Sequence, residues 1–184
     1  PGDPYFAPPP ARPFLDEVGV DPGKLRVGFS YGGATGARTD GEHTRVLDET
    51  LSVLEGLGHD VVEADPPIDN GEMQEIFRTL MASNAAQTIR LHPTKGRLPE
   101  PGEVENVVAA TAEMGERVTG YDVFLAQGRM HQAGRRMAAF HEDYDVLLTP
   151  GLGHMPPKLG WIDMMMDDAG EYWDRVAAFS PFTV

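Results

Sequence analysis

The side chains that could carry nucleophilic chemistry in this sequence are four serines and three lysines. The serines are scattered over the end of an expected strand, two expected helices and the last residues: Ser30, Ser52, Ser83 and Ser180. The lysines are Lys24, Lys95 and Lys158, and none accompanies a serine in a catalytic motif. The sequence has no GxSxG motif and no glycine loop rich in serine. We therefore assign no catalytic residue to this chain, and its substrate-binding residues stay unassigned.

Histidines and acidic residues could bind a metal, but their spacing does not favour it. No HExxH or HxxxH motif occurs among the six histidines: His43, His59, His92, His131, His141 and His154. His131 and His141 would lie ~15 Å apart along one helix, too far to share an ion. Residues 141–145 are rich in potential ligands, yet they also fit a helix end followed by a strand. Cysteine is absent, which excludes thiol catalysis and Cys-based metal sites, so we expect no metal and no cofactor.

Two segments could bind an anion. Residues 32–36 form a glycine-rich stretch between an expected strand and helix, but they match no phosphate-loop motif, and Glu42 follows in the first helical turn. We interpret this stretch as a turn. Arg129, Gln132 and Arg136 share one helix face and could grip a carboxylate. In so acidic a chain, pairing with surface Asp and Glu is the favoured interpretation.

Length, composition and charge limit the classes of protein to which this chain can belong. A chain of 184 residues fits one domain, and 41% hydrophobic residues permit a packed core. The formal charge of −14 argues against non-specific binding to nucleic acid and against adhesion to anionic membranes. The sequence has no apolar run of ~18 residues that could span a membrane and no visible secretory signal. We expect a cytoplasmic protein.

The pattern of apolar residues predicts an α/β fold. Compact apolar runs predict strands at residues 25–29, 60–64 and 145–149. Helical spacing predicts helices at 40–57, 69–91, 104–119, 121–144 and 173–179. The first helix joins two strands by short loops, so these strands should be parallel in a βαβ unit. The third strand should share their sheet. The methionines at 164–166 are expected to pack in the core or a lid.

The two ends of the sequence suggest further structure. Residues 1–14 are rich in proline and predict an extended connector. Residues 179–184 are apolar, whereas a free terminus is more often polar. We expect the sheet to continue beyond this sequence and the fragment to be incomplete as a folded body.

Several segments resemble the amidase-signature family in the order and spacing of their motifs. Lys24–Phe29 is similar to the family strand "lkglriGv", and Glu55–Glu63 is similar to its helix-to-strand step. Tyr121–Gly151 contains Tyr-Asp-Val-Leu-Leu-Thr-Pro and resembles the long helix followed by "yDvlltPt". Pro1–Pro4 resembles the stretch after the serine-rich signature, and Phe179–Thr183 the approach to the "FN.tG.Pa.s.P" strand. The resemblance covers nearly the whole chain. Within the family, the chain is similar to the bacterial amidases that include cyclic-amide and nylon-oligomer hydrolases.

This resemblance implies a mixed sheet flanked by helices, of which residues 1–184 are the C-terminal portion of a single amidase domain. It implies a Ser–cis-Ser–Lys triad upstream of this chain, which alone should be inactive. The chain would then supply wall and lid of the site, and the loop from Thr149 to Trp161 is the best candidate for these, because ligands in α/β sheets gather beyond the strand carboxyl ends. The implied partners are a small-molecule amide and the remainder of the amidase polypeptide; a homodimer is also compatible.

Two other hypotheses remain open. The A subunit of the tRNA-dependent amidotransferase belongs to the same family, but it carries arginines in the helix before the long one, where residues 104–119 here hold only Arg117. A stand-alone ligand-binding or interaction module could instead use the βαβ unit. A Ser/Gly-rich segment encoded upstream would exclude the module.

Overall fold

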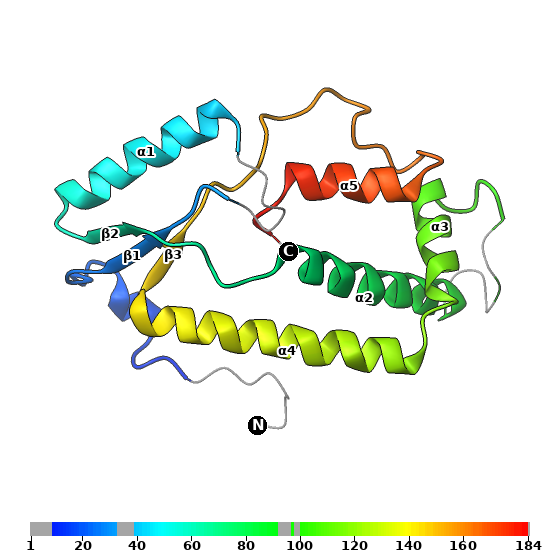
Figure 1. Cartoon of the computed structure of the whole chain (residues 1–184), viewed down its shortest axis with the longest axis horizontal. Coiled ribbons are helices and arrows are strands. Elements are labelled where there is room, and N and C mark those ends of the chain that lie inside the picture. Colours follow the sequence, from blue (N-terminus) through cyan, green and yellow to red (C-terminus); the bar gives the residue numbers. More distant parts are fainter. Residues whose placement is uncertain (1–8, 33–38, 92–96, 98–99, 184) are drawn as a thin grey trace.

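A computed structural model describes residues 9–32, 39–91, 97 and 100–183. In chain order the elements are η1 (Phe14–Glu17), β1 (Arg26–Phe29), α1 (Gly41–Gly56), β2 (Asp60–Glu63), α2 (Asn70–Leu91), α3 (Asn106–Gly115), α4 (Gly120–Asp143), β3 (Val146–Leu148) and α5 (Ala169–Phe179). Figure 1 shows the strands gathered at one end of the molecule and α2, α3 and α5 at the other, with α4 running along both. The α/β class is confirmed.

The three strands form one parallel sheet in the order β2-β1-β3. Val27 in the central strand lies opposite Val61 on one side and Val146 on the other, and it is only 1% exposed. The predictions that β1 and β2 are parallel and that β3 shares their sheet are confirmed. No antiparallel pair occurs among the described strands, so the mixed sheet implied by the resemblance would need strands beyond them.

The helix between β1 and β2 begins and ends at the predicted signals. The Asp40 side chain accepts a hydrogen bond from the His43 backbone N–H and caps the start of α1. Gly58 follows the helix with φ of +91°, a conformation that a glycine adopts without steric cost. Leu47 and Leu51 are the buried residues of α1, which packs beside β2. The predicted βαβ unit therefore forms from local signals.

Helices α1 and α4 lie on opposite sides of the sheet (Figure 1). The end of α4 packs against the central strand at Gly28, where a Cβ would lie 3.0 Å from Phe140 Cζ and 3.1 Å from the Tyr144 ring. These two aromatic rings also contact each other, with centroids 4.7 Å apart. A glycine at this position lets the two rings cover the strand closely.

The other end of the molecule is built from helices. Helix α2 packs along α3, and α3 contacts α5. The side chains buried in α2 and α3 are mostly small or branched: Ile76, Ala82, Ala86, Ile89, Val107, Thr111 and Ala112. At Gly115 a Cβ would lie 1.9 Å from the Ala82 carbonyl oxygen. Only glycine permits this approach of the two backbones.

Several helix boundaries differ from the prediction. Helix α3 covers ten residues, Asn106–Gly115, because Thr119 and Asp122 form a capping box that starts α4 at Gly120. Helix α5 begins at Ala169, where the Asp168 side chain accepts from the Glu171 N–H. The short 3-10 helix η1 was not predicted. Its residues are all exposed, so no burial pattern marks it.

Candidate substrate-binding cavity

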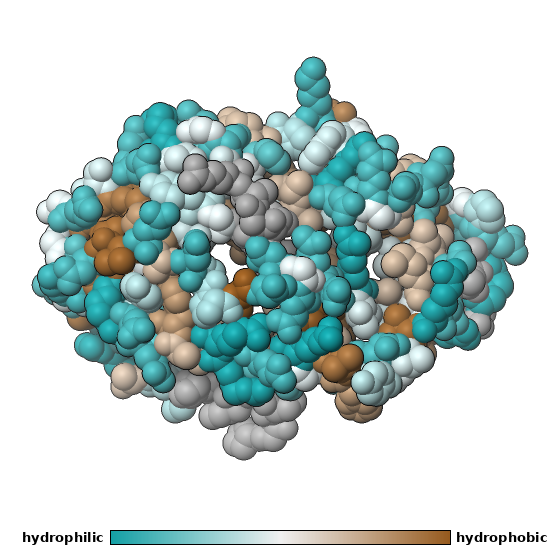
Figure 2. Space-filling model, in the orientation of Figure 1, coloured by the Kyte–Doolittle hydropathy of each residue, from teal (hydrophilic) through white to brown (hydrophobic). Residues whose placement is uncertain are grey.

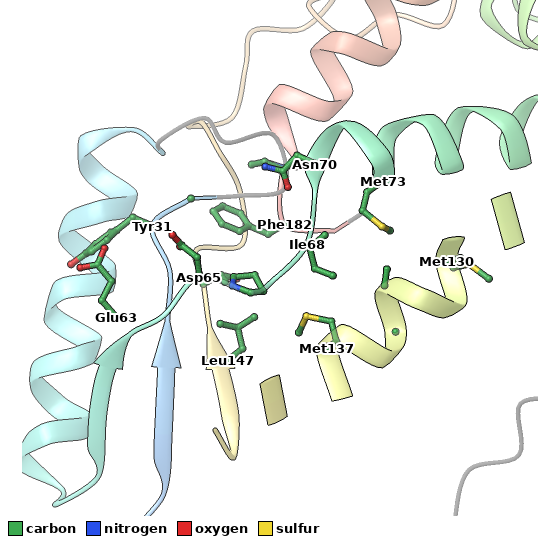
Figure 3. Close-up of a pocket in the computed structure, with 16 residues that line it drawn as sticks. Tyr31, Glu63, Asp65, Ile68, Asn70, Met73, Met130, Met137, Leu147 and Phe182 are labelled. Carbon is green, nitrogen blue, oxygen red and sulfur yellow. The ribbon is translucent and has the colours of Figure 1, made fainter. Parts of the chain in front are cut away.

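A cavity of about 750 Å³ lies beyond the carboxyl ends of the strands, between the sheet and helices α2 and α4. Its walls come from the segments after β1 and β2, from β3, from the start of α2, from the middle of α4 and from residues after α5. Figure 3 shows side chains from these separate segments facing a common space, and Figure 2 shows openings near the middle of this face. The space exceeds the lower limit of ligand pockets, ~300 Å³.

The strand order explains the position of this cavity. From the central strand β1 the chain passes to β2 on one side through α1, and then through α2–α4 to β3 on the other side. The connections that follow β1 and β2 therefore run over opposite faces of the sheet, with α1 on one face and α4 on the other (Figure 1). In open α/β sheets, such a divergence leaves a crevice at the carboxyl ends, where ligands bind.

Ser30 and Asp65 join the ends of β1 and β2 at this cavity. The Ser30 hydroxyl is fully buried and donates to Asp65 Oδ1 over 2.5 Å. The same hydroxyl accepts from the Gly32 N–H over 3.1 Å, and the Ser30 N–H donates to the Leu148 carbonyl over 3.1 Å. Among the described residues no hydrogen bond joins Ser30 to a lysine or histidine. Ser30 therefore acts as a structural link that orients Asp65.

Tyr31 lines the cavity beside these residues. Its hydroxyl donates to the carboxylate of Asp48 on α1. This hydrogen bond, together with burial and the nearby negative charges of Asp48 and Glu63, raises the pKa of Tyr31 to about 12. The phenol is therefore neutral at physiological pH, and its proton is held by Asp48 rather than offered to the cavity.

The opposite wall is apolar. Helix α4 contributes Met130, Ala133, Gly134 and Met137, which recur at the spacing of one helix face. Met73 from α2, together with Ile68, Leu147 and Phe182, completes this wall. The small residues at 133 and 134 leave room, and the flexible methionines beside them can adapt to ligands of different shape.

Comparison with known proteins decides the family. The Amidase family model matches residues 1–183. The chain belongs to the amidase family. It is 28% identical over 168 residues to a putative amidase of Synechocystis sp. and 25% identical over 183 residues to a 6-aminohexanoate-cyclic-dimer hydrolase of Paenarthrobacter ureafaciens. A solved 6-aminohexanoate cyclic dimer hydrolase complexed with substrate superposes with a TM-score of 0.76 at 23% identity, over 89% of this chain and 35% of that one.

The matched region is a minor part of each relative. It takes in 91% and 97% of this chain but only 30% and 37% of the two curated relatives. This chain thus shares the fold of one part of a longer amidase, over 89% of its own length.

The loop from Thr149 to Trp161 borders the cavity at its start and is held in place further on. Thr149 lines the cavity, whereas the following residues are tied to two helices. The Asp40 N–H donates to the Gly153 carbonyl, the Met155 N–H to the Asp40 carboxylate, and the Gly153 N–H to the Phe179 carbonyl, over 3.1, 2.8 and 2.9 Å. Hydrogen bonds from the backbone N–H groups of His43 and Met155 hold the pKa of Asp40 below its usual value. The first part of the loop is thus wall, and its middle is anchored.

Two arginines of α4, Arg129 and Arg136, pair with carboxylates of α2, as the favoured interpretation predicts. Arg129 lies 3.2 Å from Glu75, and Arg136 lies 2.6 Å from Glu72. Arg136 also donates to the Pro67 carbonyl over 3.0 Å. These contacts fasten α4 to α2 outside the cavity wall. The Glu72 carboxylate therefore accepts from Arg136. The Asp69 carboxylate accepts from the Glu72 N–H and caps the start of α2.

The remaining sequence candidates lie elsewhere. Residues 33–36 of the glycine-rich stretch, His92 and Lys95 fall outside the described residues. His59 Nδ1 accepts from the Leu25 N–H over 3.2 Å, and no group of three or more metal-ligating side chains occurs in the described part of the chain. Met164 and Met166 are half-buried and Met165 is exposed. Among the described residues no helix has the length and apolar composition that crossing a membrane requires.

Apart from Thr149, the residues that line the cavity were not predicted as site residues from the sequence. In the sequence, Glu63 and Asp65 mark only the end of a strand, and the methionines of α4 occupy ordinary apolar positions. One available signal was the combination of Met130 and Met137 with the small residues 133 and 134 on one helix face, which marks a helix side that faces space rather than close-packed neighbours.

Proposed function

We propose that residues 1–184 are the C-terminal portion of a single amidase domain, with residues 1–14 as its connector, and that the complete polypeptide hydrolyses carboxamide C–N bonds. The observation that carries the proposal is the family match over residues 1–183 together with the cavity at the strand carboxyl ends. The comparisons favour neither the amidotransferase subunit nor the stand-alone module.

The chemistry of the family assigns the reacting groups to the remainder of the polypeptide. In the Ser–cis-Ser–Lys mechanism implied by the resemblance, a serine oxygen attacks the amide carbonyl, the C–N bond breaks, and the leaving amine takes a proton. Water then hydrolyses the acyl-enzyme ester and releases the acid. The described chain would contribute the wall that holds the substrate during both steps.

Exposed apolar side chains support the presence of further polypeptide. Large side chains on η1, α1 and α4 are exposed, among them Phe14, Leu15, Leu57 and Phe124. Brown apolar patches stand among polar residues on the face shown in Figure 2. Each such side chain gains roughly 1.5–3 kcal/mol when it is buried. A neighbouring part of an amidase domain could bury them, and the chain alone should be inactive.

The names of the relatives suggest the kind of substrate. Two of them are hydrolases of the 6-aminohexanoate cyclic dimer, and another is a lipoamidase. Aliphatic amides would suit the apolar wall of Met73, Met130 and Met137. We therefore place the substrate among small amides with an aliphatic acyl chain.

The test compares the complete polypeptide with the 184-residue chain on a panel of aliphatic carboxamides. The complete polypeptide should hydrolyse at least one amide, and the shorter chain none. Met137→Trp would fill the cavity and should lower kcat/KM at least about tenfold, whereas the exposed Met165→Trp should leave it within twofold. Failure of the complete polypeptide to hydrolyse any amide would refute the proposal.

A further inference from the structure

The cavity separates charge from apolar surface. Asp65 lies at the ends of β1 and β2, with Glu63 beside Tyr31 towards α1, while Met73, Met130 and Met137 lie across the space on the helices (Figure 3). Among the described residues, the sixteen that line the cavity include these two carboxylates and no lysine, arginine or histidine. A ligand that spans the cavity therefore meets negative charge at one end and methionine side chains at the other.

The described cations near the cavity lie outside its lining. Three arginines of α4 are next in sequence to lining residues: Arg129 pairs with Glu75, Arg136 pairs with Glu72, and Arg135 is exposed and does not line the cavity. The net charge of −14 adds to the negative field. A cleft with one sign of charge and low-dielectric walls concentrates ligands of the opposite charge.

Of the two carboxylates, Asp65 is the better placed to bind a ligand in the cavity. Ser30, which is fully buried, donates to its Oδ1 over 2.5 Å and fixes the orientation of the group. The Asp65 side chain itself is exposed, so its other oxygen is accessible from the cavity. A carboxylate oriented by a buried hydroxyl binds with less loss of side-chain freedom than a free surface carboxylate.

We propose that Asp65, oriented by Ser30, determines charge specificity: it binds a cationic or hydrogen-bond-donating group at the far end of an aliphatic acyl chain and disfavours amides that end in a carboxylate. This inference rests on the proposed function, because it assigns the cavity to the acyl part of an amide. A substrate carboxylate would approach Asp65 with no basic side chain among the described lining residues, and such like-charge contacts are a common source of discrimination.

The test uses the complete polypeptide and three p-nitroanilides of matched length: 6-aminohexanoyl, heptanoyl and 6-carboxyhexanoyl. The value of kcat/KM should be highest for the substrate that ends in an ammonium group, intermediate for the one that ends in a methyl group and lowest for the one that ends in a carboxylate. The highest and lowest values should differ at least about tenfold. High salt should reduce this ratio, because ionic screening weakens exposed charge interactions. Equal rates for the ammonium and carboxylate substrates, or a preference for the carboxylate, would overturn the inference.

Asp65→Asn keeps the oxygen to which Ser30 donates and removes the charge. It should bring the ammonium-to-carboxylate ratio down to within about threefold, mainly through KM, and change the rate of the heptanoyl substrate less than the rates of the two charged substrates. Glu55→Gln is the matched control: it removes one exposed carboxylate at the end of α1 that precedes β2, on the amino side of the sheet. A purely structural defect would lower all three rates together, and a ratio unchanged in Asp65→Asn contradicts the assignment.

A binding measurement separates this inference from the proposed function. Chemical-shift titrations of the same polypeptide with hexylammonium and with hexanoate require no turnover. Tighter binding of hexylammonium, lost in Asp65→Asn, would support charge selection even if no anilide were hydrolysed. Equal binding of hexanoate would refute it even if the polypeptide were an active amidase.

Discussion

The sheet half and the helical half of this chain are held together in different ways. In the sheet half, β1, β2 and β3 pair through backbone hydrogen bonds, and large aromatic rings from α4 cover Gly28. In the helical half, α2 and α3 cross closely at Gly115, among alanines and a few branched side chains. Helix α4 joins the two halves through Phe140 at one end and Arg129 and Arg136 along its length.

The difference explains where the cavity lies. A parallel sheet leaves its carboxyl edge open, whereas closely packed helices leave little space between them. The cavity therefore forms where the open edge of the sheet meets α2 and α4, with polar groups from the strand ends and apolar groups from the helices. The chemical asymmetry of the site follows from the architecture of the two halves.

The largest effect should come from adding a side chain at Gly115, where α2 and α3 cross closely. Gly115→Val places side-chain carbons where a Cβ already lies 1.9 Å from the Ala82 carbonyl oxygen. Because the obstacle is backbone, α2 and α3 must separate, and we expect the free energy of unfolding to fall by at least about 3 kcal/mol. Urea denaturation of wild-type and variant protein measures this.

Gly128→Ala is the control for this prediction. Gly128 lies within α4, and a Cβ added there would meet no heavy atom within 4 Å apart from its own helix and chain neighbours. The added methyl should stabilise the helix by about 0.5–1 kcal/mol, because alanine has the higher helix propensity. If Gly115→Val were as well tolerated as Gly128→Ala, close helix packing would not be what holds the helical half.

A smaller effect should distinguish Val27 from Val107. Both are 1% exposed, but Val27 lies in the central strand and Val107 in α3. Val27→Ala should cost about 1.5–3 kcal/mol from lost burial. Val107→Ala loses a similar burial but gains roughly 0.5 kcal/mol of helix propensity, so its cost should be lower. Equal losses measured by urea denaturation would show that secondary structure makes no difference at these two core positions.

The same contrast explains how much of the fold the sequence could predict. The sheet half follows local signals: apolar runs for the strands, Asp40 at the start of α1 and Gly58 after its end. The boundary between α3 and α4 was wrong because Thr119 and Asp122 cap a new helix within an apolar pattern that continues across it. The place of the cavity beyond the strand carboxyl ends was expected, but most of its lining could not be predicted, since Asp65, Met73 and Met137 come together only after β3 joins the sheet.

The smallest effect concerns two carboxylates, one in each half. Hydrogen bonds from the Arg26 side chain and backbone lower the pKa of Asp145 from 3.8 to about 2, and this pair ties β1 to the segment after α4 across 119 residues. Hydrogen bonds from the Arg97 side chain and the Glu100 backbone lower the pKa of Glu103 from 4.5 to about 2, but Arg97 is only six residues away. Both carboxylates are partly exposed, so each ion pair should stabilise the folded state only modestly.

Asp145→Asn should therefore lower the Tm at pH 7 slightly more than Glu103→Gln does, because only the Asp145 pair is broken whenever the chain loses its tertiary fold. The sign of the pH dependence follows from the lowered pKa values. Each carboxylate stabilises the fold fully above its ordinary pKa and loses this contribution as pH falls from about 4 towards 2, where the folded state also takes up the proton. The Tm differences from wild type should thus shrink towards pH 2. Glu55→Gln corrects for the removal of one negative charge from an acidic chain, and an Asp145→Asn difference that grows on acidification would contradict the assigned hydrogen bonds.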